Sequence, residues 1–335
     1  MADGRHEHGL VIGKFYPLHK GHQLLIDAAL RACERVTVCM TFRPDESIPA
    51  HLRYLWIREL FPAVRIVTLA PPTPYYPSEC ASAQDFYDTW KRLLLEQCDE
   101  LPGIVFTSED YGDEIAHYWG IEHVCVDKAR RAVPVSATAI RKNPYAHRQY
   151  LDPIVRPYFV KTVAIDGPES CGKTTLAAQL ARHYATVWQP EFAREWLGER
   201  HCVYDDMEPI AEGHLRERER YKCLADGVLF VDTSAVTTNV FSEKYYGRCP
   251  PRVEQILSLP ENRDDLCLLL SADVPWVKDT SRDLGEPAVR EEMYDRFENV
   301  LRERYGSRCV RISGTWQQRF EAAVAAVDAL LRGRS

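Results

Sequence analysis

The sequence predicts an α/β protein with two parallel sheets in tandem. The chain has 335 residues, enough for two domains of ordinary size. In both halves, short β-rich runs alternate with helical patterns, which is typical of βαβ units and a parallel sheet wrapped on both faces. A proline-containing segment at 143–157 separates the halves. We therefore expect two domains, residues 1–157 and 158–335.

The first half shows regular alternation. Strands are expected at 10–13, 36–40, 64–69, 104–107 and 123–126. Helices are expected between them, at 21–33, 50–60, 82–97 and 110–118.

The second half begins with a fresh strand after Pro157. Strands are expected at 160–166, 186–189, 228–232, 267–270 and 310–312. Helices are expected at 175–183 and 316–331. The last helix carries one apolar stripe, which predicts core packing, at Phe320, Val324, Val327 and Leu331.

Composition and charge exclude several classes of protein. With 42 Lys and Arg against 49 Asp and Glu, the net charge of −7 disfavours nucleic acid as a partner, because that needs a clustered positive field. The N-terminus lacks an apolar signal segment, and no apolar run is long enough to span a bilayer. The 11 cysteines include no CxxC pair, so we expect reduced thiols. We therefore expect a cytoplasmic protein without stable membrane insertion.

A first candidate site follows the first expected strand. The segment GKFYPLHKGH places His19 and His22 at the start of a helix, where backbone N–H groups already favour an anion. Gly21 lets the backbone approach closely. Lys14 adds a positive charge. The expected binding residues also include the backbone around the strand end, Gly13 and Phe15.

A second element of this site lies more than a hundred residues later, in VSATAIR. Ser136 and Thr138 suit a helix start, and Arg141 lies one turn in. A strand, an HxGH motif and a late [ST]xTxxR together resemble the nucleotidyltransferase superfamily, which joins a nucleoside triphosphate to a phosphorylated partner. Attack by a phosphate on the α-phosphate of ATP needs alignment and positive charge rather than a strong base. We expect Mg²⁺ to arrive on the triphosphate.

A second candidate site follows the strand at 160–166. The segment GPESCGKT is a GxxxxGK[ST] phosphate loop at a strand-to-helix junction. Backbone N–H groups would hold the phosphates, Lys173 would reach the β and γ oxygens, and Thr174 would hold Mg²⁺. The remaining residues expected to contact the nucleotide are Gly167, Ser170, Gly172 and Thr175.

Other residues could complete this second site. Asp232 ends a strand where a Walker-B acid would contact Mg²⁺. Glu191 is a candidate base for a hydroxyl acceptor, with Arg194 beside it, and the choice between Glu191 and Asp232 as base stays open. Arg282, in DTSRDLG, resembles the arginine of a kinase lid that neutralises the transferring phosphoryl group.

The whole arrangement resembles the NadR-type bifunctional enzymes, in which a nicotinamide mononucleotide (NMN) adenylyltransferase is fused to a ribosylnicotinamide kinase. The resemblance runs through GKFYPLHKGH, VSATAIR, VRPYFVKTVAI, GPESCGKT, EFAREW, VDTSAVTT and WVKDTSRDLG. It implies an HxGH Rossmann-like domain followed by a P-loop kinase domain. The second domain would phosphorylate nicotinamide riboside with ATP, and the first would convert the product to NAD and pyrophosphate.

The resemblance also implies aromatic residues that stack on the nicotinamide ring. The candidates are Tyr76, Trp90, Trp119, Trp196 and Tyr246. Some members of the family carry an N-terminal helix-turn-helix domain. The catalytic strand begins near residue 9 here, so we expect no direct repression of transcription.

Two other functions remain open on these motifs. A fused pantetheine-phosphate adenylyltransferase and dephospho-coenzyme A kinase would carry the same pair of motifs. A non-catalytic nucleotide sensor would be expected to lack Lys173, His19 or His22, and all three are present. A homo-oligomer is compatible with either enzyme.

Overall fold

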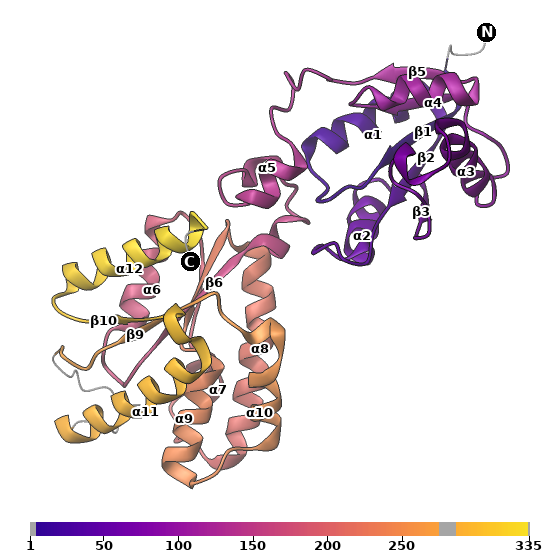
Figure 1. The fold of residues 1–335 in the computed structure, drawn as a ribbon. Helices are drawn as coiled ribbons and strands as arrows, with labels where there is room; N and C mark the ends of the chain where they lie inside the picture. The colour runs from indigo at the N-terminus through magenta and orange to yellow at the C-terminus, as the bar shows by residue number, and fades with distance from the viewer. Residues whose placement is uncertain (1–4, 275–285, 334–335) are drawn as a thin grey trace. The chain divides into compact units, whose positions relative to one another are not determined.

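The computed structural model describes residues 5–274 and 286–333, and it divides the chain into two compact units, Met1–Val155 and Arg156–Ser335 (Figure 1). The division lies close to the boundary that the prolines suggested. In the described part of the chain, each unit contains one five-stranded parallel sheet. The predicted α/β class with two tandem parallel sheets is confirmed.

The first unit has the strand order β3-β2-β1-β4-β5. Its strands are β1 His6–Gly13, β2 Cys33–Thr41, β3 Arg65–Leu69, β4 Ile104–Thr107 and β5 Glu122–Cys125. Its helices are α1 Lys20–Ala32, α2 Ala50–Leu60, α3 Ala83–Leu95, α4 Tyr111–Trp119 and α5 Ala137–Lys142. β1 is central, with Val11 paired to Val38 of β2 and to Phe106 of β4. The strand order reverses at β1, so the loop after β1 lies where ligands of such sheets bind.

The core between this sheet and helices α3 and α4 contains two of the predicted stacking residues. Trp90 and Trp119 are only 9% and 5% exposed. Their indole N–H groups donate to the backbone oxygens of Pro74 and Tyr87, at 2.8 and 2.9 Å. Both rings are enclosed in this core and both donors are satisfied, so the structure favours a packing role for Trp90 and Trp119, and their stacking on a ligand stays a prediction.

The second unit has the strand order β10-β9-β6-β8-β7. Its strands are β6 Lys161–Asp166, β7 Trp188–Gln189, β8 Val228–Asp232, β9 Leu266–Leu270 and β10 Cys309–Ile312. Its helices are α6 Lys173–His183, α7 Phe192–Leu197, α8 Met207–Leu224, α9 Ala235–Tyr246, α10 Pro251–Ser258, α11 Pro287–Tyr305 and α12 Trp316–Leu331. β6 is central and lies between β8 and β9, so the phosphate loop that follows it is also at a reversal of strand order.

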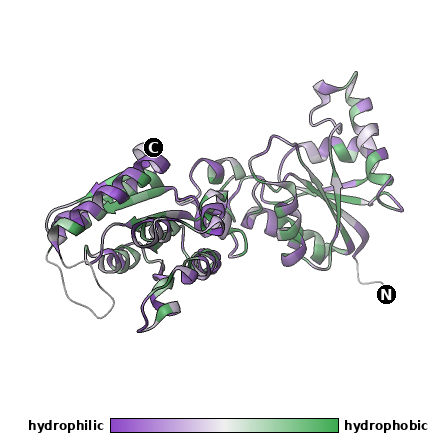
Figure 2. Cartoon of the chain, turned by 90° about the horizontal axis from the view of Figure 1, so that it is seen from below, coloured by the Kyte–Doolittle hydropathy of each residue, from purple (hydrophilic) through white to green (hydrophobic). Residues whose placement is uncertain are grey.

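The helices cover their sheets through apolar faces. Figure 2 shows hydrophobic residues along the strands and on one side of many helices, with hydrophilic residues on the other side. On α11 the buried residues recur every four positions, at Met293, Phe297, Leu301 and Tyr305. No helix in residues 5–274 and 286–333 is long and apolar enough to cross a membrane.

Helix α12 departs in part from the predicted stripe. Val327 and Leu331 are buried as expected, but Phe320 and Val324 are only partly buried. The buried face instead runs through Arg319 and Ala323. The reason is the Arg319 guanidinium, which is 1% exposed and donates to backbone oxygens at the edge of the phosphate loop.

Candidate functional site

The loop after β1 places His19 at the start of α1. His19 is the N-cap residue, and its Nδ1 accepts a hydrogen bond from the Gly21 backbone N–H at 3.0 Å. Because Nδ1 accepts, the proton of a neutral ring must be on Nε2. A Cβ added at Gly21 would lie 2.8 Å from the His19 ring, so glycine allows this approach.

The two histidines of the motif lie against each other. The rings of His19 and His22 stack with 3.9 Å between centroids, and Phe15 contacts His22 edge-on at 5.0 Å. Burial, with a smaller effect of the Arg130 charge, lowers the pKa of His19 to about 4. Burial and the neighbouring His19 lower the pKa of His22 well below its usual value. Both rings are therefore neutral near pH 7, and the buried Nδ1 of His22 makes no hydrogen bond within residues 5–274 and 286–333.

The late motif lies beside this loop, as the sequence predicted. Ser136 caps α5 by accepting from the Ala139 N–H at 3.1 Å. Arg141 donates to the backbone oxygen of Tyr16 and, at 3.1 Å, to Thr138 Oγ1. Its guanidinium also lies 4.4 Å from the centre of the Tyr16 ring. A cation 125 positions away in the sequence thus reaches the histidine loop.

Several neighbours of Lys14 were missed by the sequence analysis. The Lys14 ammonium lies 4.1 Å from the centre of the Tyr75 ring and 4.0 Å from a Glu46 carboxylate oxygen. Arg53 is fully buried and donates to the Lys14 backbone oxygen at 2.9 Å and to Glu46 at 2.8 Å. Arg43 approaches Tyr75 to 4.2 Å. These residues come from separate loops and from α2, so no local motif marked them.

The phosphate loop between β6 and α6 has the backbone that the motif requires. Gly167, Ser170 and Gly172 have φ angles of 145°, 57° and 93°. The two glycines adopt these angles freely, whereas a serine at positive φ is strained. The Lys173 ammonium donates to the backbone oxygens of Gly167 and Pro168, at 2.9 and 2.8 Å. The loop and its lysine therefore form a compact cationic cradle at the start of α6.

Thr174 and Asp232 meet at the base of this cradle. The Thr174 hydroxyl donates to Asp232 Oδ2 at 2.6 Å. The other carboxylate oxygen, Oδ1, is buried and has no hydrogen-bond partner in the part of the chain that the structure describes. Burial raises the pKa of Asp232 to about 6. A hydroxyl and an underused carboxylate oxygen are the ligands that Mg²⁺ takes at such loops, so these two residues fit the metal of a nucleotide complex.

Asp166 links this loop to the next element and was also missed. Its buried carboxylate accepts from the Ser234 N–H at 2.8 Å and from the Thr237 hydroxyl at 2.9 Å. These contacts join the end of β6 to the start of α9. The position just before the loop was the only sequence signal that could have marked it.

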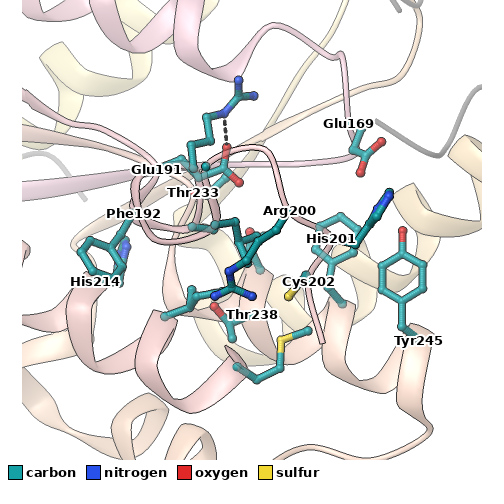
Figure 3. A pocket seen from close by; sticks show the side chains of 18 of the residues that line it. Glu169, Glu191, Phe192, Arg200, His201, Cys202, His214, Thr233, Thr238 and Tyr245 are labelled. Carbon is teal, nitrogen blue, oxygen red and sulfur yellow. Dashed lines mark hydrogen bonds and ion pairs between the residues drawn. The ribbon is translucent and has the colours of Figure 1, made fainter. Parts of the chain in front are cut away.

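A pocket of about 400 Å³ opens beside the phosphate loop (Figure 3). Its wall includes Glu169, Ser170 and Lys173 from the loop and Glu191, which follows β7 and caps α7. Glu191 accepts from Arg194 Nε at 2.7 Å, the pair joined by the dashed line in Figure 3. The structure therefore places Lys173, Glu191 and Arg194 at one pocket.

The aromatic residues around this pocket differ from those predicted. Tyr245 lines the pocket, whereas Tyr246 donates from its hydroxyl to the Cys202 backbone oxygen at 2.9 Å and is not among the lining residues. Trp196 is 43% exposed and donates from its indole to Asp206 at 3.0 Å. In the other unit, Tyr76 is 58% exposed. Tyr245 thus replaces Tyr246 as the tyrosine of the pocket wall.

Glycine on α8 sets the position of Phe192, the neighbour of Glu191. A Cβ added at Gly213 would lie 1.9 Å from the Phe192 ring, which therefore packs directly on the helix backbone. Phe192 is buried and lines the same pocket as His214 of α8. The predicted lid residue Arg282 lies outside the described residues.

Comparisons with known proteins agree with this two-site architecture. Residues 162–319 match a family model described as "AAA domain". The chain is 32% identical over 314 residues to the Trifunctional NAD biosynthesis/regulator protein NadR of Escherichia coli K12, covering 88% of this chain and 75% of that protein. The protein of the same description from Salmonella typhimurium LT2 is 30% identical over 88% of this chain and 76% of its own length.

Solved structures are similar over almost the whole chain. A NadR protein in complex with NR superposes with a TM-score of 0.78 at 22% identity, covering 98% of this chain and 96% of that chain. A NadR protein in complex with NAD and AMP-PNP superposes with a TM-score of 0.75 at 23% identity and the same coverage. At this identity the two structures establish the shared fold.

Proposed function

The chain belongs to the NadR family, and we propose that it is a bifunctional NAD-salvage transferase. The second unit phosphorylates nicotinamide riboside with ATP to give NMN. The first unit transfers AMP from ATP to NMN to give NAD and pyrophosphate. The observation that carries this proposal is that each unit presents a complete phosphate-binding loop at its own strand-order reversal, after β1 and after β6.

In the first unit, we propose that NMN attacks the α-phosphate of ATP. The phosphate of NMN is already an anion at neutral pH, so the site needs no general base. Neutral His19 and His22 would donate N–H bonds to phosphate oxygens. Lys14 and Arg141 would stabilise the charge that develops on the leaving pyrophosphate. Gly13, Phe15 and Gly21 would shape the backbone around the triphosphate, with Ser136 and Thr138 holding the start of α5.

In the second unit, a riboside hydroxyl attacks the γ-phosphate. Backbone N–H groups of residues 167–175, including those of Gly172 and Thr175, would hold the phosphates, with Lys173 on the β and γ oxygens. Thr174 and Asp232 would hold Mg²⁺, which would neutralise charge on the β and γ oxygens.

We propose Glu191 as the base that accepts the hydroxyl proton. Glu191 lines the acceptor pocket, whereas Asp232 is paired with the Thr174 hydroxyl and is not among the pocket's lining residues. Arg194 would orient the Glu191 carboxylate. Arg282 remains a proposed source of positive charge for the transferring group.

The partners proposed for this chain are small molecules: ATP, nicotinamide riboside and NMN. We propose the cytoplasm as the location, because both reactions consume ATP. Nucleic acid is not a proposed partner, in keeping with the net charge of −7. A homo-oligomer remains compatible with the proposal.

The experiment is a time course by mass spectrometry. The purified protein is incubated with ATP, Mg²⁺ and nicotinamide riboside, and NMN and NAD are followed. NMN should appear first and NAD afterwards. Accumulation of NMN without NAD would contradict the adenylyltransferase activity proposed for the first unit. Turnover of dephospho-coenzyme A in place of the riboside would favour the coenzyme A alternative.

A further inference from the structure

Trp316 stands beside the phosphate loop of the second unit and has no part in the functions described so far. It is the first residue of α12, which lies alongside α6 (Figure 1). Its side chain is 50% exposed. A Cβ added at Gly172 would lie 2.4 Å from a carbon of the indole, so the ring touches the loop backbone. A large aromatic surface is therefore open to solvent next to the triphosphate cradle.

The helix start that carries this indole is anchored by a buried arginine one turn further along α12. Arg319 donates to the Cys171 backbone oxygen at 2.9 Å, to Ser271 at 3.0 Å and to Gly314 at 2.9 Å. It also pairs with Asp273. These bonds tie the start of α12 to the phosphate loop and to the end of β9. The start of α12 is therefore held against the phosphate loop before any ligand binds.

The topology of the sheet determines the side on which the nucleoside must lie. The acceptor pocket is lined by Glu191, which follows β7, and by Thr233, which follows β8. Both strands lie on one side of β6. Because the γ-phosphate must face the acceptor for in-line transfer, the nucleoside end of ATP extends to the opposite side, that of β9 and β10. Trp316 follows β10 on that side.

We propose that Trp316 is the surface on which the base of ATP stacks in the second unit. The assignment rests on the proposed kinase function of this unit. The indole is half exposed, contacts the phosphate loop at Gly172 and has the Arg319 guanidinium 5.8 Å from the centre of its ring. Stacking of a base on an aromatic side chain tolerates any base, because every base has a π-face. Trp316 therefore supplies affinity for the nucleoside rather than a preference for adenine.

A purely structural role for Trp316 makes a different prediction. If the indole only supported Gly172, its removal would distort the phosphate loop. Binding of the phosphates alone would then weaken as much as binding of ATP. Inorganic tripolyphosphate separates the two roles, because it has the phosphates and lacks the base.

The test measures two constants in riboside phosphorylation, followed as ADP formation. These are the KM for ATP and the inhibition constant of tripolyphosphate, in wild type, Trp316→Ala and Trp316→Phe. Trp316→Ala should raise the KM for ATP about tenfold, about 1.4 kcal/mol, and leave the tripolyphosphate constant within about twofold. Trp316→Phe should recover most of the affinity. An unchanged KM for ATP, or parallel losses for both compounds, would overturn the proposal.

A binding measurement keeps the test independent of the acceptor. Mg·ADP should quench tryptophan fluorescence in the wild type, and this part of the signal should be missing in Trp316→Phe. If the riboside is not phosphorylated but the difference in quenching persists, the stacking assignment stands and the proposed acceptor is wrong. An identical quenching curve in both proteins would contradict the assignment.

Discussion

The loops after β1 and after β6 have the same position in their sheets but differ in the groups that could bind a phosphate. Each connects a central strand to a helix at a reversal of strand order. The first offers side chains: two stacked imidazoles, with Arg141 reaching in from α5. The second offers mainly backbone N–H groups and Lys173, with the carboxylates of Asp232 and Glu191 nearby.

The difference follows from the two proposed acceptors. A phosphate acceptor arrives already ionised, so neutral donors and cations suffice in the first unit. A hydroxyl acceptor must lose a proton, so the second unit needs a carboxylate close to the transferring phosphoryl group. With these proposed reactions, one strand-loop-helix framework supports both adenylyl transfer and phosphoryl transfer, and the surrounding side chains determine which reaction occurs.

Replacing the lysine of the phosphate loop should abolish one activity and leave the other. Lys173→Ala should lower riboside phosphorylation at least about 10³-fold, because it removes the ammonium that reaches the β and γ oxygens. Adenylyl transfer from supplied NMN should stay within about twofold. The two rates are measured separately by liquid chromatography. Loss of both activities with an unchanged circular dichroism spectrum would contradict the two-site comparison.

His22→Ala is the reciprocal change. It should lower adenylyl transfer about 10²-fold by removing a donor to the phosphates, and it should spare the kinase. His183→Ala is the matched control, a histidine near the end of α6, and should leave adenylyl transfer unchanged. Equal rates for His22→Ala and wild type would show that the imidazoles are not the phosphate donors of this loop.

Arg53→Met tests whether the first loop depends on its buried ion pair. Removing the guanidinium takes the buried partner from the largely buried Glu46 carboxylate and leaves it with the Lys14 ammonium and the Arg43 backbone N–H, which should cost about 3 kcal/mol of stability. Adenylyl transfer should be lost at a lower temperature than in wild type, while the kinase keeps its own inactivation temperature. The control is Arg65→Met, at an exposed pair with Asp99. Equal inactivation temperatures for Arg53→Met and wild type would refute the role of the pair.

The protonation state of His19 provides a test that concerns the first loop alone. Its pKa of about 4 lies below the usual value of 6.5, because burial disfavours the charged ring. Between these pH values the unfolded chain binds a proton that the folded chain does not. The free energy of unfolding therefore decreases as the pH falls from about 6.5 to about 4. Histidine NMR, assigned with His19→Asn, should show a neutral ring at pH 6. A ring that titrates near 6.5 would contradict this expectation.

The smallest expected effect concerns the side chain inside the second loop. Cys171 is fully buried, and burial raises the pKa of its thiol. Because the loop binds phosphate through its backbone, Cys171→Ala should keep the kinase kcat/KM within about threefold and cost about 1 kcal/mol of stability. Steady-state kinetics and urea unfolding measure both quantities. A loss as large as that of Lys173→Ala would mean that the side chain contributes directly.

The sequence predicted both loops because their signals are local. A strand, a glycine motif and a helix start occupy about twenty consecutive residues in each case, and the boundaries fall within a few residues of those expected. Helix α11 was missed although Met293, Phe297 and Leu301 recur at a spacing of four. Helix α9 gives no such signal, because it is buried on several sides and has no single apolar stripe.

The residues around the loops were harder to predict because tertiary contacts select them. Arg53, Glu46 and Tyr75 meet Lys14 only after α2 and two loops have packed. Trp90, a predicted stacking residue that the fold encloses in a core, shows a second difficulty. The sequence carries no signal that distinguishes an aromatic residue in a core from one in a binding pocket. Only the fold distinguishes the two.

The missing side chain at Gly213 has a consequence for engineering. A mid-helix glycine costs about 0.5–1 kcal/mol relative to alanine, and here it lets the Phe192 ring pack directly on the backbone of α8. Any larger residue must displace that ring and, with it, the adjacent Glu191. The residue at position 213 therefore controls the position of the Phe192 ring from outside the pocket. A substitution there would change the position of the Phe192 ring in the pocket wall through a residue that does not itself line the pocket.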